Sequence, residues 1–120
     1  MGAMTCGWDP SQFAILDKVF VEPGTRTPTS CKATVYVKTS TPINFTLQMI
    51  NADDWSYIGS TSIQFAIPIP PPPPTWSLVT VTNTYGCSRA INVRIGITGS
   101  NIGIAAPFAL IDDVEIDWFY

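Results

Sequence analysis

The segment from Asn51 to Tyr57 combines residue types that could bind a ligand. It places the rings of Trp55 and Tyr57 next to the carboxylates of Asp53 and Asp54, in what reads as a hairpin loop. Aromatic rings stack on apolar faces, and carboxylates accept hydrogen bonds from hydroxyl groups. A sugar has both an apolar C–H face and hydroxyl edges, so this loop is a candidate binding site. The alternative is that Trp55 folds back over the end of the fold and packs there.

Other segments carry side chains of the same kinds. Alternation places Tyr36, Gln48 and Arg94 on the polar sides of their segments, where they either converge on one face or are ordinary surface residues. Tyr85, which lies in a turn, is a further candidate, whereas we expect Trp76 in the core. The candidate binding residues are therefore Tyr36, Gln48, Asp53, Asp54, Trp55, Tyr57, Tyr85 and Arg94.

The chain offers little for catalysis. It contains no histidine, which is the commonest general acid or base at neutral pH. The pairs Asp53-Asp54 and Asp112-Asp113 are adjacent in sequence, whereas glycoside hydrolysis needs two acids that face each other across a cleft. The sequence pairs no nucleophile with a base, and no glycine-rich phosphate loop precedes a helix. We therefore predict a protein that is not an enzyme.

Length and composition limit the class of protein. The 120 residues are 46% hydrophobic and 12% charged, with a net charge of −3, which suits one folded domain. Residues 1–4 look like an expression remnant, so we expect residues 5–120 to form that domain. The six Lys and Arg residues are spread thinly, so no cationic cluster is available to bind nucleic acid or an anionic membrane. We expect neither as a partner.

Period-two alternation of apolar and polar residues is the main structural signal. Residues 14–21 could open a helix, but Val19, Val21 and the following Pro23-Gly24 favour a strand. Short strands separated by turn residues predict an all-β fold, an antiparallel β-sandwich of jelly-roll type. The other predicted strands cover residues 32–38, 44–50, 62–67, 76–84, 90–98 and 108–118.

The cysteines and a proline run add two expectations. Cys6, Cys31 and Cys87 are compatible with one disulfide and one free thiol in an exported protein, or with three buried thiols. The proline-rich residues 68–74 predict an extended connection on the surface between two strands.

Several short motifs follow one another in an order typical of a known family. The closing segment 108–116 resembles the last strand of the jelly-roll carbohydrate-binding modules attached to bacterial cellulases and xylanases, the families numbered four, nine and twenty-two. The family's opening strand has no counterpart in residues 5–12. Either the module is abbreviated, or this sequence lacks one strand of it. The other similar segments are 21–25, 33–39, 76–81 and 91–97.

This resemblance implies non-catalytic binding of a plant or microbial polysaccharide, such as β-glucan or xylan, with no cofactor required. It also implies attachment to a glycoside hydrolase and an extracellular or cell-surface location. The family's cleft crosses the concave sheet, where Tyr36, Gln48 and Arg94 would meet. The family's structural calcium implies Asp112 or Asp113 as a ligand, while the alternative is that both form hydrogen bonds at a bulge.

A second interpretation of the whole chain also stands. The low charge, the mean hydropathy of +0.22 and the proline run are compatible with a surface that meets another protein. The alternative is therefore a structural or adhesive β-sandwich domain that contacts proteins and binds no sugar.

Overall fold

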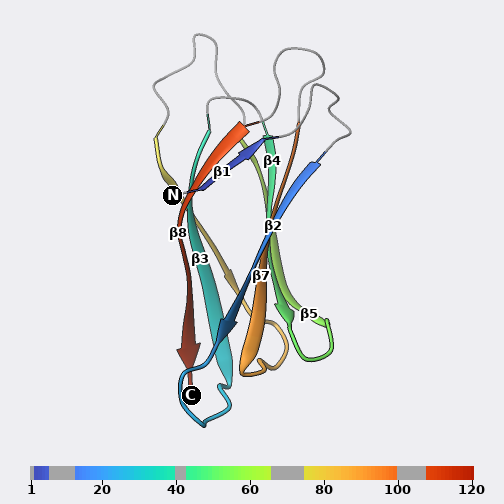
Figure 1. The fold of residues 1–120 in the computed structure, drawn as a ribbon, viewed down its shortest axis with the longest axis vertical. Helices are drawn as coiled ribbons and strands as arrows, with labels where there is room; N and C mark the ends of the chain where they lie inside the picture. Colours follow the sequence, from blue (N-terminus) through green and yellow to red (C-terminus); the bar gives the residue numbers. More distant parts are fainter. Residues whose placement is uncertain (1, 6–12, 40–42, 66–74, 100–107) are drawn as a thin grey trace.

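The computed structural model describes residues 2–5, 13–39, 43–65, 75–99 and 108–120. Within them, eight strands form two antiparallel sheets that pack against each other (Figure 1). The strands are β1 (Gly2–Thr5), β2 (Phe13–Val21), β3 (Ser30–Lys38), β4 (Ile43–Asn51), β5 (Tyr57–Phe65), β6 (Ser77–Thr82), β7 (Ala90–Gly99) and β8 (Phe108–Phe119).

The order of the strands confirms the predicted jelly-roll sandwich. One sheet has the order β1-β8-β3-β6 and the other has the order β2-β7-β4-β5, so successive strands often lie in different sheets. The strand predicted over residues 14–21 is confirmed as β2, which pairs with β7 along its whole length. The described ranges hold no helix with the length and hydropathy of a membrane span.

The core forms where the apolar faces of the two sheets meet. Val35 on β3, Phe45 on β4 and Ile95 on β7 are fully buried, as the alternation of their segments predicts. The rings of Phe45 and Phe65 meet edge to face with their centroids 6.2 Å apart. Burial of such side chains contributes about 1.5–3 kcal/mol each, so the core is the main source of stability.

A bulge in β8 keeps both halves of this long strand facing the core. Ile111 points inward before the bulge and Val114 after it, although strict alternation would turn one of them outward. The register with β3 shifts between Tyr36↔Asp112 and Thr34↔Glu115, and Asp113 adopts a left-handed backbone with φ of 51°. The bulge proposed as one alternative for the Asp112-Asp113 pair is thus present.

Two other features differ from the sequence prediction. Residues 2–5 were expected to lie outside the domain, but they form β1, which pairs with β8. Strand β5 begins at Tyr57 rather than at residue 62, because its polar Ser and Thr residues hide the pattern. The proline run and Cys6 lie outside the described residues.

A disulfide bond joins strand β3 to the loop between β6 and β7. It links Cys31 at the start of β3 to Cys87 in the loop that leads into β7, and both residues are buried. Close to it, β5 approaches β6 so tightly that a Cβ atom on Gly59 would lie 2.7 Å from the carbonyl oxygen of Thr82. The predicted alternative with three reduced cysteines is therefore wrong.

Candidate functional site

The outer face of the β2-β7-β4-β5 sheet brings together two of the predicted site residues. Gln48 on β4 and Arg94 on β7 are register partners, and Arg94 also pairs with Asp17 on β2. Arg94 donates two hydrogen bonds to the Asp17 carboxylate, from Nε to Oδ1 at 2.8 Å and from Nη2 to Oδ2 at 3.1 Å. These bonds lower the pKa of Asp17 and raise the pKa of Arg94. They also fix the plane of the guanidinium on an inner strand.

Tyr57 joins this group from the start of β5. Its side chain is exposed and interacts with Arg94. This interaction raises the pKa of Arg94, although Asp17 has the larger effect. Tyr57 also follows the β4–β5 turn directly, so its ring connects the sheet face to the loops at the end of the sandwich. Three predicted site residues, Gln48, Tyr57 and Arg94, therefore lie on one face.

A hollow of about 230 Å³ lies beside Arg94 on the same face. Ile15 forms an exposed apolar side of it, and the amides of Asn44 and Gln48 form a polar side. An apolar surface next to hydrogen-bond donors and acceptors suits a ligand with apolar faces and hydroxyl edges. The full lining consists of Ile15, Asn44, Thr46, Gln48, Arg94, Gly96, Ile97 and Thr98.

The β4–β5 turn exposes the ring of Trp55. The Trp55 backbone has a φ of 62°, a left-handed conformation that costs a bulky residue about 1–2 kcal/mol. Its side chain is 59% exposed, so Trp55 does not pack over the end of the sandwich. Asp54 accepts hydrogen bonds from the Ser56 amide at 3.0 Å and the Ser56 hydroxyl at 2.7 Å, and these bonds lower the pKa of Asp54. Asp54 thus shapes the turn, and Asp53 beside it is exposed.

Asn51 ties this turn to the β6–β7 loop, which carries Tyr85. The Ser88 amide donates to Asn51 Oδ1 at 3.0 Å, and the Ala52 amide donates to the carbonyl oxygen of Ala90 at 2.9 Å. The two loops lie next to each other at the lower end of Figure 1. Tyr85 is 71% exposed. The predicted residues Asp53, Asp54, Trp55 and Tyr85 therefore occupy one end of the sandwich, next to the face that carries Tyr57.

Tyr36 does not share a face with Gln48 and Arg94, so that part of the prediction is wrong. Strand β3 belongs to the β1-β8-β3-β6 sheet, and Tyr36 points to solvent on the opposite side of the molecule. The cause is strand order, which depends on contacts distant in sequence. Tyr36 is instead the register partner of Asp112, and both line another hollow with Asp113 and Trp76. Trp76 is 37% exposed, so the expectation that it lies in the core is also wrong.

The predicted metal ligands sit at the bulge in β8. The Asp113 amide donates to Asp112 Oδ1 at 3.0 Å, as expected for a local hydrogen bond at a bulge. Within the described parts of the chain, no three His, Cys, Asp or Glu side chains gather where they could hold a metal ion. Calcium binding at Asp112 or Asp113 stays a prediction.

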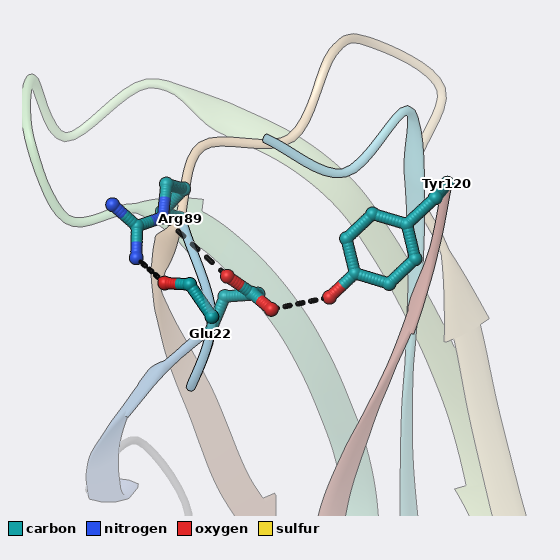
Figure 2. A network of polar contacts seen from close by, with 4 residues as sticks. Glu22, Arg89 and Tyr120 are labelled. Carbon is teal, nitrogen blue, oxygen red and sulfur yellow. Dashed lines mark hydrogen bonds and ion pairs between the residues drawn. The ribbon is translucent and has the colours of Figure 1, made fainter. Parts of the chain in front are cut away.

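Figure 2 shows a polar network at the end of the sandwich where the C-terminal residue lies. The Tyr120 hydroxyl donates to Glu22 Oε1, and Arg89 Nε lies 3.4 Å from Glu22 Oε2. The hydrogen bond from Tyr120 lowers the pKa of the buried Glu22, with smaller contributions from the Gly24 backbone and from Arg89, while the same carboxylate raises the pKa of Tyr120. The Arg26 guanidinium stacks 4.5 Å from the centroid of the Tyr120 ring. This network joins the ends of β2 and β8 to the start of β7.

Sequence reasoning missed Asp17 and Ile15 on the sheet face. Both lie on the outward side of β2, where alternation with Leu16 and Lys18 could have placed them. The sequence does not show that β2 lies next to β7, so the pairing of Asp17 with Arg94 could not be predicted from it. Asn92, which alternation places on the same face, is only 1% exposed because its register partners Val19 and Ile50 flank it.

Comparison with known proteins shows the fold. No protein-family model matches the chain, and no curated protein matches it at a significant level. Among solved structures, the chain is similar to TmCBM61 in complex with β-1,4-galactotriose, with a TM-score of 0.64 and 12% sequence identity. The alignment covers 97% of this chain and 68% of that protein.

Proposed function

We propose that this domain, which has the β-sandwich fold of a carbohydrate-binding module, binds saccharides without transforming them. The observation that carries the proposal is a hollow on one exposed sheet face that Gln48 and Arg94 line, with Tyr57 in contact with Arg94 beside it. The similar fold of TmCBM61, whose structure contains β-1,4-galactotriose, supports the ligand class. The pairs Asp53-Asp54 and Asp112-Asp113 are adjacent in sequence, whereas glycoside hydrolysis needs two acids that face each other across a cleft, and this supports a role that is not enzymatic.

In the proposed mechanism, apolar side chains contact the sugar face and polar side chains form hydrogen bonds with its hydroxyl groups. The Tyr57 ring and the Ile15 side chain receive the apolar face of a sugar. Arg94 and Gln48 donate hydrogen bonds to its hydroxyl groups, and Gln48 also accepts. Because Asp17 already holds Arg94 in a bidentate pair, little side-chain entropy is lost when the ligand binds. Trp55 and Tyr85 extend the surface at the end of the sandwich for longer chains.

The remaining elements of the proposal follow the resemblance found in the sequence. The ligand is a plant or microbial oligosaccharide or polysaccharide, with β-glucan, xylan and β-1,4-galactan as the first glycans to test. The domain works outside the cell or at its surface, attached to a glycoside hydrolase that it keeps near the substrate. A structural calcium ion at Asp112 or Asp113 would stabilise the fold.

Affinity electrophoresis tests the proposal. Gels that contain galactan, xylan or β-glucan are expected to retard the protein, and Gln48→Ala and Arg94→Ala are each expected to reduce the retardation. Thr80→Ala, on an exposed position of the opposite sheet, is the matched control and should migrate as the unsubstituted protein does. Equal retardation of all four proteins would contradict the assigned face. Release of reducing sugar from any of these glycans would contradict the non-catalytic role.

A second candidate function is adhesion through protein contacts, and the edge strand β2 favours it. Ile15, Val19 and Val21 are exposed on its outer face, and Leu16 is exposed on the other side. An apolar edge strand of this kind can pair with another chain. Absence of retardation in every glycan, together with concentration-dependent association that Val19→Lys abolishes, would support this function instead.

A further inference from the structure

The outer face of the β1-β8-β3-β6 sheet carries a second hollow, on the side of the molecule opposite Arg94. It has a volume of about 210 Å³ and is lined by Tyr36, Trp76, Asp112 and Asp113. Tyr36 stands on the inner strand β3, where its register partners are Leu78 on one side and Asp112 on the other. Tyr36 is 40% exposed, so this ring is open to solvent although its strand is central. Two rings and two carboxylates therefore surround one recess.

The bulge in β8 is what brings both carboxylates to the recess. In a regular strand Asp112 and Asp113 would point to opposite faces of the sheet. Here Asp113 has a φ of 51°, an uncommon conformation for a residue other than glycine, and both side chains line the hollow. A bulge of this kind changes the direction in which a side chain points, and bulges are over-represented next to active sites.

Lys38 contacts Trp76, so the two rings of the hollow differ in how open their faces are. Its ammonium lies over the Trp76 ring, 5.6 Å from the centroid, so that a cation already covers one face of the indole. The Tyr36 ring is therefore the platform on which a flat apolar face can stack, and Trp76 forms a side wall. The carboxylates of Asp112 and Asp113 accept hydrogen bonds from hydroxyl groups and repel anions.

We propose that this hollow is a second saccharide-binding site, specific for neutral sugars, so that one domain holds two glycan segments on opposite faces. A sugar ring stacks on Tyr36, and two of its hydroxyl groups donate to Asp112 and Asp113 in charge-assisted hydrogen bonds. Chains of uronic acids are excluded because their carboxylates would meet those of the protein. The inference takes its ligand class from the proposed function but uses none of the residues of the first face.

Isothermal titration calorimetry of the whole chain tests this inference. The probes are the neutral trisaccharides β-1,4-galactotriose, cellotriose and xylotriose, with trigalacturonate as the acidic counterpart. One double variant, Tyr36→Ala/Trp76→Ala, removes the rings of the hollow, and another, Gln48→Ala/Tyr57→Ala, removes groups of the first face. Phe119→Ala is the matched control, because it deletes an exposed ring from the far end of β8 in the same sheet. Thermal unfolding checks that each variant folds, and Tyr36→Phe keeps the platform without the hydroxyl.

We expect two sites in the unsubstituted protein for at least one neutral trisaccharide, with both sites kept by Phe119→Ala and Tyr36→Phe. Loss of the Tyr36 and Trp76 rings should weaken the second site at least tenfold, roughly the effect of 1.4 kcal/mol. The Gln48→Ala/Tyr57→Ala variant should retain one site that binds trigalacturonate at least tenfold more weakly than the neutral sugar.

Other outcomes separate this inference from the proposed function. An unchanged titration of Tyr36→Ala/Trp76→Ala would overturn the second site and leave the first face standing. If Tyr36→Ala/Trp76→Ala lost all binding while Gln48→Ala/Tyr57→Ala bound as the unsubstituted protein does, the first face would be overturned and the hollow supported. No binding of any neutral trisaccharide by the unsubstituted protein would overturn both.

Discussion

Replacement of Cys31 and Cys87 by alanine is expected to cost the domain a large part of its stability. The two cysteines are separated by 56 residues in the sequence, so their disulfide closes a long loop in the unfolded chain. In the chain-entropy description, a loop of this length corresponds to about 4 kcal/mol at 25 °C. Single domains are stable by about 5–15 kcal/mol, so this loss leaves a marginal fold. Both side chains are buried, and alanine introduces no polar group in their place.

Urea unfolding followed by tryptophan fluorescence measures this effect. The Cys31→Ala/Cys87→Ala variant should unfold at a urea concentration lower by about 2 M, because the slope for a small domain is about 1–3 kcal/mol per molar urea. Cys6→Ala is the control, since it removes the third cysteine and leaves the bridge intact. A loss of less than about 1 kcal/mol in the double variant, well under the chain-entropy value, would refute the reasoning.

Two further predictions concern single residues. Arg94 lowers the pKa of Asp17 in the folded state. The pair therefore stabilises the fold above the unfolded-state pKa of about 4. This stabilisation is lost as the pH falls through the lower folded-state pKa. Urea unfolding between pH 6 and 2 should therefore show a smaller loss of stability on acidification for Asp17→Asn than for the unsubstituted protein, and identical profiles would contradict the pairing. At position 55, where φ is 62°, Trp55→Gly should be about 1 kcal/mol more stable than Trp55→Ala, because glycine alone adopts this conformation without strain. Equal stability of these two variants would show that the turn relaxes on substitution.

Much of the fold could be predicted from local sequence patterns. Alternation identified the buried faces of β3, β4 and β7, where Val35, Phe45 and Ile95 are fully buried. It could not reveal β1, since Gly2–Thr5 is too short to show a period and is held in place by pairing with β8. Nor could it show that Asn92 is buried, because its register partners come from two other strands.

The candidate site depended more heavily on contacts distant in sequence. Residue types and alternation were enough to choose Gln48 and Arg94, which prove to be register partners. The same reasoning placed Tyr36 with them, because strand order decides which outward face a residue joins and no local pattern encodes that order. The pairing of Arg94 with Asp17 was equally hidden, as the two residues are 77 positions apart.

Two-dimensional NMR of the ¹⁵N-labelled chain, titrated with β-1,4-galactotriose, cellotriose and xylotriose, tests the saccharide-binding face most directly. A saturable shift of the amide signals of Gln48 and Arg94, together with that of Tyr57 at the start of β5, is the expected result for at least one of these sugars. Saturable binding that leaves these three signals in place would contradict the assigned face. The absence of any shift with all three sugars at millimolar concentration would contradict saccharide binding itself.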